Sequence, residues 1–562
     1  MEDEPLLGET PAEDESTVEV STTETTIEPL SDAQLNQIRA TYDIDARYII
    51  SHCSVDFIVR MKSHPKDKDD LVSFCEGALQ GNDVLLARIR EFQTSYSANQ
   101  AIVWLQEPFL SICITQIFKS ASVETMYYFR ILIRDLQRQL NEHQCTTPLQ
   151  VYLSEVMPEE QLIKLKSLNG KIIAMKSFLL TNLVRETALS LTASIPLTNG
   201  LKRTLFIIEA NPQTGNGKSF AKLASLGHSN DQNIVVFTIG LVFQVTEIAD
   251  ETNGINTIKL TLSTNDAIHE TRQHCDQLKR KYINEQNETS RIRFGEFAFD
   301  LGKSFGVSDV SDGGKNIIHR CLEISSSAGD DAESDRLECY DTLGNIELKQ
   351  TNCDLSLDSY KEGFDLRKSK QPENDLDLAK SYQHLANVSL AKKDSQQARE
   401  YLQNLVTTWK KFCGDDCSDL IFCYSNLAEI YQKENNPTEA LVYYHRTLSI
   451  MTKHKYPDDD KSAKIYYNVG EVCTALGQYQ IALGYYSASL EIRSKTCSTV
   501  DPTIAATYRG MGLLYKSMGN VQQAQAHLEK AAAIYRELYE PTNPIRVAIE
   551  ESIQNLSGPD RD

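Results

Sequence analysis

Apolar and polar positions in the C-terminal half of the chain repeat with a period of 42 residues. One column of the repeat consists of Tyr340, Tyr382, Tyr424, Tyr466 and Tyr508. A second column, sixteen residues further on, consists of Ala398, Ala440, Ala482 and Ala524. Repetition at a fixed period of this length is the signature of a solenoid of stacked units, which builds a long concave surface. The pattern therefore predicts a repeat array that holds a partner.

Within each period, apolar residues at spacings of three, four and seven predict two amphipathic helices. Turn signals rich in Asn, Gly and Pro separate the two helices. A small residue in the first helix would let the second helix approach closely, and the small positions are Ala386, Ala428, Gly470 and Gly512. We expect the tyrosine column to lie in the core, and we expect residues 542–556 to form a capping helix.

These repeats resemble the tetratricopeptide repeat (TPR), in the 42-residue form found in kinesin light chains. The resemblance covers about residues 335–556 and rests on several columns in register, with Asp501-Pro502 and Asn543-Pro544 at the expected places. The repeat that begins near Tyr340 is weaker, because Ser356 stands where later repeats have alanine. A more degraded unit at residues 294–302 precedes it, off the 42-residue period.

The resemblance implies that one face of the first helices lines a concave groove that binds a protein or peptide. Polar residues three positions apart share a helix face. The candidate partner-binding residues form two such columns: His384, Asn426 and Asn468, and then Asn387, Glu429 and Glu471. The alternative is a solvated helix face with no partner.

The N-terminal half has a different pattern. Residues 69–143 have helical spacing, and the period then changes at about residue 148. Strand-like runs follow at 150–153, 171–180, 204–209, 234–245 and 257–262, with helices at 158–168 and 183–192. Helices followed by several β runs indicate an α+β domain.

The order of these pieces resembles the arginine-specific mono-ADP-ribosyltransferases, which cleave NAD at the nicotinamide bond. The matching pieces span about residues 70–265: 101–104, 128–135, Val151-Tyr152, 177–179, 205–209, 235–243 and 257–262. The family uses an arginine on its first strand, whose planar fork suits the NAD phosphates. It also uses a serine that orders the site and a Glu-x-Glu pair that stabilises an oxocarbenium-like transition state.

The resemblance places these catalytic positions on residues that lack the required groups. The arginine position is Leu153, the serine position is Leu180, and the glutamate pair falls on Gln232 and Ile234. Asp231 is a possible substitute carboxylate if the register shifts by one residue, although such a slip reverses the facing side of a strand. Tyr152, Ser177 and Phe178 either line a surviving NAD pocket or only fill the core.

Charge and composition limit the other classes of function. The net charge is −21, and residues 1–30 carry ten of the acidic groups and no Lys or Arg. Such an acidic segment reads as a disordered tail, and the acidic balance gives no support for nucleic-acid binding. Gly215-Asn-Gly-Lys218-Ser219 resembles the end of a phosphate-binding loop, but Pro212 occupies the position of its first glycine.

The thirteen cysteines are scattered, with no paired Cys-x-x-Cys set that would bind zinc, and Cys413 and Cys417 are the closest pair in the array. We therefore expect reduced thiols, a cytoplasmic location, no metal and no membrane partner. No secretory signal and no apolar run long enough to span a bilayer is apparent in the sequence.

Together these patterns predict a multidomain chain: an α+β ADP-ribosyltransferase-like domain followed by an all-α TPR solenoid. The expected parts are an acidic tail at 1–35, the transferase-like domain at 70–265, a linker at 266–290 and the TPR array at 291–556. The predicted function is a protein-binding adaptor that carries an inactive transferase-like domain and needs no cofactor. The alternative is an active NAD-dependent protein-arginine mono-ADP-ribosyltransferase whose repeats select the substrate.

Overall fold

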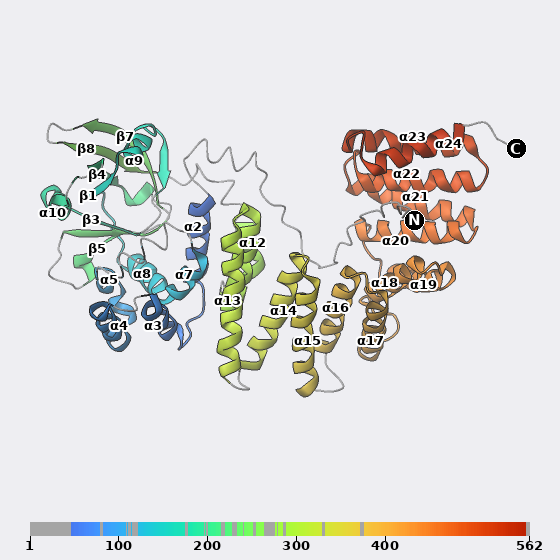
Figure 1. The fold of residues 1–562 in the computed structure, drawn as a ribbon, viewed down its shortest axis with the longest axis horizontal. Helices are drawn as coiled ribbons and strands as arrows, with labels where there is room; N and C mark the ends of the chain where they lie inside the picture. The colour runs from blue at the N-terminus through green and yellow to red at the C-terminus, as the bar shows by residue number, and fades with distance from the viewer. Residues whose placement is uncertain are drawn as a thin grey trace, which may run out of the picture. The chain divides into compact units, whose positions relative to one another are not determined.

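The protein is described by a computed structural model (Figure 1). The structure describes residues 46–78, 82–107, 110, 114, 122–174, 178–195, 197, 200–214, 220–226, 233–239, 241–250, 254–263, 276–277, 279–284, 288–328, 332–370 and 376–557. The chain divides into two compact units between Ile346 and Glu347. The expected acidic tail at 1–35 lies outside the described residues, as do the phosphate-loop-like segment at 215–219 and much of the expected linker.

The N-terminal unit begins with a group of helices that share one hydrophobic core. They are α2 (Ala46–Val59), α3 (Asp67–Ala78), α4 (Asp83–Ser95), α5 (Ala101–Trp104), α7 (Val123–Tyr128) and α8 (Arg130–Glu142). The helical pattern expected over 69–143 is present in the described residues, whereas most of 108–121 lies outside them. The helical pattern is interrupted between α7 and α8 at Phe129, which is fully buried. Leu132, Ile133 and Leu136 of α8 are fully buried, because the apolar stripe of this helix faces the core.

An eight-stranded mixed sheet follows, in the order β2-β7-β8-β4-β1-β3-β6-β5. Its strands are β1 (Leu149–Pro158), β2 (Ile172–Ala174), β3 (Leu179–Asn182), β4 (Leu201–Ala210), β5 (Phe220–Lys222), β6 (Ile234–Phe237), β7 (Val242–Asp250) and β8 (Ile255–Leu262). The helices α9 (Glu159–Lys166) and α10 (Arg185–Ala193) interrupt the strands. Within this sheet only β4 and β8 pair in parallel. The α+β character expected from the sequence is therefore present.

Two strand-like runs of the sequence each prove to be two separate strands. The run at 171–180 contains β2, which lies at one edge of the sheet beside β7, and β3, which pairs with β1 and β6. The run at 234–245 contains β6 and the start of β7, which lie far apart in the strand order. The break in each run falls at residues that interrupt the apolar pattern, Lys176-Ser177 in the first run and Thr238-Ile-Gly240 in the second.

Two further helices, α12 (Arg291–Phe305) and α13 (Ser308–Ser327), form a close pair within the N-terminal unit. A Cβ added to Gly295 would meet Cγ1 of Ile318 at 2.6 Å, and one added to Gly314 would meet the carbonyl oxygen of Gly295 at 2.5 Å. The helix α14 (Glu333–Lys349) crosses the division between the units. The region expected as the TPR array, 291–556, therefore contributes helices to both units.

The C-terminal unit is all helical, and Figure 1 shows its successive helix pairs stacked from α18 to α24. Its helices are α15 (Cys353–Lys370), α16 (Leu376–Ala391), α17 (Ser395–Cys413), α18 (Leu420–Lys433), α19 (Pro437–Lys453), α20 (Asp460–Ala475), α21 (Tyr479–Thr496), α22 (Pro502–Ser517), α23 (Val521–Leu538) and α24 (Pro544–Ser557). Asp394, Asn436 and Asn520 cap the second helices, since each side chain accepts a hydrogen bond from the backbone N–H three residues on. The expected capping helix is α24.

The small column brings the two helices of each repeat together. Ala386 and Ala428 are fully buried. A Cβ added to Gly470 would meet the ring of Tyr486 at 2.9 Å, and one added to Gly512 would meet Cγ of Leu528 at 2.7 Å. The alanine column that begins at Ala398 is fully buried in every repeat. The close approach that the small residues predict is therefore present.

The tyrosine column is less buried than expected. Tyr424 is 2% exposed, but Tyr340, Tyr382, Tyr466 and Tyr508 are only half-buried. The column with the most deeply buried large side chains lies instead in the second helices and consists of Tyr360, Leu402, Tyr444, Tyr486 and Leu528. The tyrosine rings pack at the edge of each helix pair, as Tyr466 does against Tyr485 with a centroid distance of 6.2 Å.

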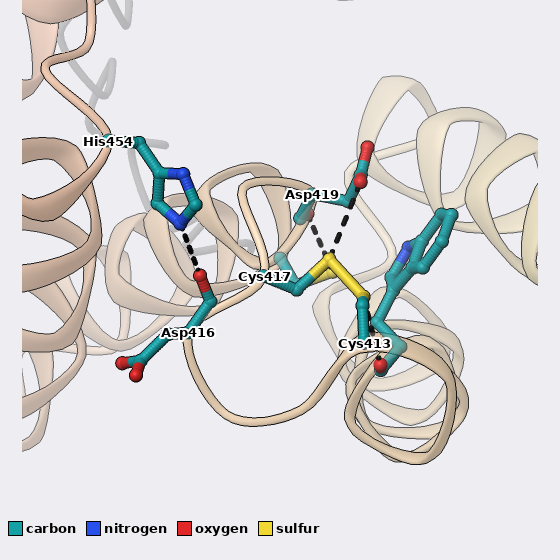
Figure 2. The surroundings of a disulfide bond; sticks show 7 residues. Cys413, Asp416, Cys417, Asp419 and His454 are labelled. Carbon is teal, nitrogen blue, oxygen red and sulfur yellow. Dashed lines mark hydrogen bonds between the residues drawn. A yellow bond between two sulfur atoms is a disulfide. The ribbon is translucent and has the colours of Figure 1, made fainter.

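One cysteine pair departs from the expectation of reduced thiols. Cys413 and Cys417 form a disulfide in the turn between α17 and α18 (Figure 2). Nine of the other cysteines within the described ranges are free thiols. Scattered cysteines in the sequence carry no information on pairing, because the bond depends on the Cα separation, here 5.5 Å, that the turn creates.

Candidate functional site

The predicted partner-binding residues occupy one face of α16, α18 and α20. Each helix contributes residues three positions apart, so their side chains lie on one face, one turn apart. Most of these side chains are half-buried, and Asn387 is only 7% exposed. The α16 members differ from the rest, because the His384 ring packs on Tyr360 at a centroid distance of 4.7 Å. The more accessible polar positions therefore belong to α18 and α20.

Hydrogen bonds join this face from one repeat to the next. Nδ2 of Asn468 donates to Oε1 of Glu429 over 3.1 Å, which links α20 to α18. Nζ of Lys464 lies 3.2 Å from the same carboxylate oxygen. Glu429 is thus shared by an amide and an ammonium group, and both come from the following repeat.

A second set of bonds runs one helical turn further along. Oε2 of Glu471 accepts from Nε2 of Gln432 over 3.0 Å, and Oε1 of Glu471 accepts from the hydroxyl of Tyr467 over 2.6 Å. The Tyr444 hydroxyl donates to Oε1 of Gln432 over 3.3 Å. Burial, and next the nearby Glu471 carboxylate, raise the pKa of Tyr467, so its hydroxyl stays protonated and donates. We call the residues of these two sets, Glu429, Gln432, Tyr444, Lys464, Tyr467, Asn468 and Glu471, the polar ladder.

The sequence reasoning found some members of the polar ladder and missed others. Asn468, Glu429 and Glu471 were predicted, whereas Gln432, Lys464 and Tyr467 were not. The sequence offers one indication of Tyr467. Tyr466 occupies the repeat's tyrosine column, so the adjacent Tyr467 must lie on a different face of the helix. Asn426 is placed on the same face, but its Nδ2 donates to the carbonyl oxygen of Phe422 in its own helix over 2.8 Å.

The polar ladder ends at α22. The two columns continue there as Gly510 and Leu513, and the Leu513 side chain is 42% exposed. A Cβ on Gly510 would lie 2.9 Å from the ring of Tyr486, so a larger residue is excluded at that position by close packing. The helix face that carries these columns therefore changes from hydrogen-bonding to apolar between α20 and α22.

In the N-terminal unit, strand register separates the positions that resemble the transferase catalytic residues. Directly paired residues of neighbouring strands share a face, and side chains alternate along each strand. Tyr152 pairs with Asn182, and Asn182 pairs with Ile234. Leu180 lies two residues from Asn182 and so shares that face, whereas Leu153 lies on the opposite one.

Packing agrees with this assignment of faces. Leu180 and Ile234 pack against the core formed with the N-terminal helices. Leu153 packs in a separate core on the other side of the sheet, together with Val151 and Phe206. The residue of β1 that stands beside Leu180 and Ile234 is therefore Tyr152, which is half-buried.

The other predicted pocket residues are only partly described. Phe178 is 4% exposed and belongs to the helical core. Ser177, Asp231 and Gln232 lie outside the described residues. Across the part of the chain that the structure describes, no group of three or more His, Cys, Asp or Glu side chains is arranged to hold a metal ion. Within the same part, no helix is long and apolar enough to cross a membrane.

Comparison with known proteins identifies the repeats. The family model described as tetratricopeptide repeat matches residues 377–453 and 461–544. No curated protein matches the sequence. Similar solved structures include BtubC (BKLC) from P. vanneervenii, which is 18% identical with a TM-score of 0.35 over 41% of this chain and 93% of that one.

Two other solved structures show similar likeness. A putative kinesin light chain from Podosopora anserina with nearly identical TPR-like repeats is 19% identical, with a TM-score of 0.32 over 36% of this chain and 97% of its own. YrrB, a TPR protein with an unusual peptide-binding site, is 19% identical, with a TM-score of 0.28 over 38% of this chain and 91% of its own. These three TM-scores are low, and the assignment of the repeats rests on the family model alone. The C-terminal unit contains tetratricopeptide repeats over residues 377–453 and 461–544.

Proposed function

We propose that the chain is a protein-binding adaptor whose repeats hold an extended segment of a partner along α16, α18 and α20. The observation that carries the proposal is the polar ladder, which places hydrogen-bonding groups of successive repeats in register on one face. TPR proteins present such faces as concave binding surfaces. An extended peptide carries a backbone donor or acceptor at each residue and so complements a row of amide groups.

The charge balance of this face favours recognition by hydrogen bonds over recognition by charge. Glu429 already has Lys464 and Asn468 as partners, and Glu471 has Tyr467 and Gln432. Asn426 uses one N–H on the carbonyl oxygen of Phe422, which leaves its Oδ1 and a second N–H for a ligand. The amide of Asn468 bonds to both Glu429 and the Tyr444 hydroxyl, which leaves its Oδ1 for a ligand. We therefore assign partner contact to Asn426 and Asn468, and assign repeat-to-repeat support to Glu429 and Glu471.

A phage-displayed library of random peptides, selected on the full-length chain, tests this proposal. Peptides that bind should lose affinity by about tenfold in the variant Asn426→Ala/Asn468→Ala, because losing one or two hydrogen bonds costs roughly 1–2 kcal/mol. Their affinity should change little between low and high salt, because the two side chains assigned to partner contact, Asn426 and Asn468, are uncharged. Fluorescence anisotropy with the selected peptides measures both effects.

The matched control is His445→Ala/Ser487→Ala. These exposed residues form one repeat column on the second helices and belong to neither polar set. The control should bind the selected peptides as the unmodified chain does. Equal loss of affinity in both variants, or selected peptides that bind both variants at full strength, would reject the assigned face.

For the N-terminal unit we propose an ADP-ribosyltransferase-like domain that lacks catalytic activity and that the adaptor presents as a decoy or regulator. The order of helices and strands supports this proposal. So does the composition of the face shared by β1, β3 and β6, where Tyr152, Leu180, Asn182 and Ile234 stand without a guanidinium or carboxylate among them. None of these four described residues supplies the negative charge that stabilises an oxocarbenium-like transition state.

The alternative, an active transferase, predicts NAD binding. If the pocket is lost, calorimetric titration of the full-length chain with NAD at about millimolar concentration should give no binding heat. A Kd of 1 mM corresponds to a binding free energy of only about 4 kcal/mol, so even a weak residual site would be detected. A parallel assay for NAD hydrolysis should show none. Hydrolysis that Asp231→Ala abolishes, with Asp69→Ala in α3 as control, would overturn the inactive assignment and leave the peptide-binding proposal untouched.

A further inference from the structure

The turn between α17 and α18 contains a cysteine pair that the proposed function does not use. Cys413 is the last residue of α17, and Cys417 lies two residues before Asp419, the N-cap of α18. The disulfide between them closes a short ring around Gly414, Asp415 and Asp416, as Figure 2 shows. Every residue of the ring except Cys417 is exposed.

The two sulfur atoms differ in access. Cys413 is exposed, whereas Cys417 is 8% exposed and is covered by the turn. A thiolate from solution can therefore attack Sγ of Cys413, with Cys417 as the leaving group. The free cysteine nearest in sequence, Cys423, is fully buried in α18 and is not available to such a reagent.

The same backbone also suits the reduced pair. Sγ of Cys413 lies 3.2 Å from the carbonyl oxygen of Trp409, and Sγ of Cys417 lies 3.5 Å from Oδ2 of Asp419. On reduction the two sulfur atoms must move apart to van der Waals separation, and each thiol then has a hydrogen-bond acceptor close by. Both redox forms of the pair can therefore be accommodated in the same turn, which reversible exchange requires.

The ring also connects two repeats. Nε2 of His454, the C-cap of α19, lies 2.6 Å from the carbonyl oxygen of Asp416, and Figure 2 shows the two groups facing each other. Lys453 pairs with the Asp416 carboxylate. Lys410 of α17 lies 2.8 Å from Asp415. The cross-linked turn is therefore held against the end of the next repeat.

We propose that Cys413 and Cys417 form a reversible thiol–disulfide site that tightens the contact between the α17–α18 turn and the end of α19 when oxidised. Reduction consumes two molecules of a low-molecular-weight thiol. The first thiolate attacks Sγ of Cys413, the S–S bond breaks, and Cys417 leaves as a thiolate and takes up a proton. The second thiolate attacks the mixed disulfide, releases Cys413, and the reagent departs as its own disulfide. Oxidation is the reverse exchange, with a low-molecular-weight disulfide as the two-electron acceptor.

The first test is equilibration of the native full-length chain in a series of reduced and oxidised glutathione ratios. Free thiols are then trapped with a maleimide, and mass spectrometry measures the labelling of the peptide that contains both cysteines. The disulfide fraction should rise from below about a tenth in the most reducing buffer to above about nine tenths in the most oxidising one. Chains that start oxidised and chains that start reduced should reach the same fraction in each buffer. Cys423 should remain unlabelled throughout as the internal control.

Two outcomes would overturn the proposal in this test. In one, the pair stays oxidised in the most reducing buffer that leaves the circular dichroism of the chain unchanged. In the other, the pair stays reduced in the most oxidising buffer. Because this measurement uses the unmodified chain, it does not depend on whether a variant folds.

Hydrogen exchange measures the conformational effect. Reduction should speed amide exchange in residues 414–420 and 454–456 by about threefold or more, because the turn then loses its covalent cross-link. The variant Cys413→Ser/Cys417→Ser should exchange at the faster rate in every buffer. Exchange rates that are the same in oxidised and reduced chains would show that the pair exerts no control on the turn, and would overturn this part of the proposal.

Discussion

At the residue scale, buried charges tie distant segments of the N-terminal unit together. The Arg130 side chain is fully buried, and its guanidinium contacts the carboxylates of Asp67 at 2.9 Å and Asp70 at 2.5 Å. Arg320 of α13 reaches the same Asp70 at 3.3 Å. Removing one partner of such a group leaves an uncompensated buried charge, which costs several kcal/mol. Arg130 lies in the segment 128–135 that resembles the transferase family, but its pairing with Asp67 and Asp70 is visible only in the tertiary structure.

Asp56 provides a pH-dependent example. Burial alone would raise the pKa of Asp56, but Lys279, whose Nζ lies 2.6 Å away, and Arg60 outweigh burial and lower the pKa to about 2. A carboxyl group with a lowered pKa in the folded state contributes stability above its unfolded pKa, and that contribution is lost as the pH falls toward the folded pKa.

We therefore expect Asp56→Asn to reduce stability above about pH 4, with the difference from the unmodified chain shrinking as the pH falls toward 2. Urea unfolding of both proteins across that pH range measures the difference. A constant difference for Asp56→Asn at every pH would contradict the ion-pair explanation.

At the element scale, packing decides what glycine does in the helices of the array. Gly512 of α22 and Gly484 of α21 are both interior helix positions. A Cβ on Gly512 would lie 2.7 Å from Cγ of Leu528, whereas a Cβ on Gly484 would have no atom within 4 Å. Helix propensity alone would favour alanine at both positions by about 1 kcal/mol.

The two glycines should therefore respond oppositely to alanine. Gly512→Ala should destabilise the array by roughly 1–3 kcal/mol, because the added methyl group forces α22 and α23 apart. Gly484→Ala should stabilise it by about 0.5–1 kcal/mol. Urea unfolding monitored by helical circular dichroism compares both variants. Stabilisation by Gly512→Ala would mean that the helix pair relaxes without cost and that the small column is not needed.

At the scale of the whole molecule, much of the architecture was predictable because its contacts are local. Each repeat packs on its neighbours only, so the 42-residue columns reveal both helices, the small positions and the cap at α24. The positions of α9, α10 and most strands were also predictable, since period and turn residues mark them. The breaks between β2 and β3 and between β6 and β7 were not predicted, because Lys176-Ser177 and Thr238-Ile-Gly240 are short interruptions that do not show where each strand lies in the sheet.

The candidate sites likewise contain features that residue spacing predicts and features that depend on tertiary packing. Repetition alone placed Asn468, Glu429 and Glu471 on one helix face, because a helix face follows directly from residue spacing. That Gln432 and Tyr467 share Glu471 depends on the separation between α18 and α20, which no local pattern contains. Likewise, Leu153 could be aligned with a family motif, but only strand register shows that it faces away from Leu180 and Ile234.

The amino-acid sequence by itself thus determined the repeat array, its helices and the helix face that carries the polar columns. Spacing along one chain is sufficient for these features, since they depend on contacts between near neighbours. The tertiary structure alone decided the strand order, the face on which each strand residue lies, the bonds of the polar ladder and the pairing of Cys413 with Cys417. Each of these depends on how far apart two segments come to rest, and that distance is set by packing of the whole unit.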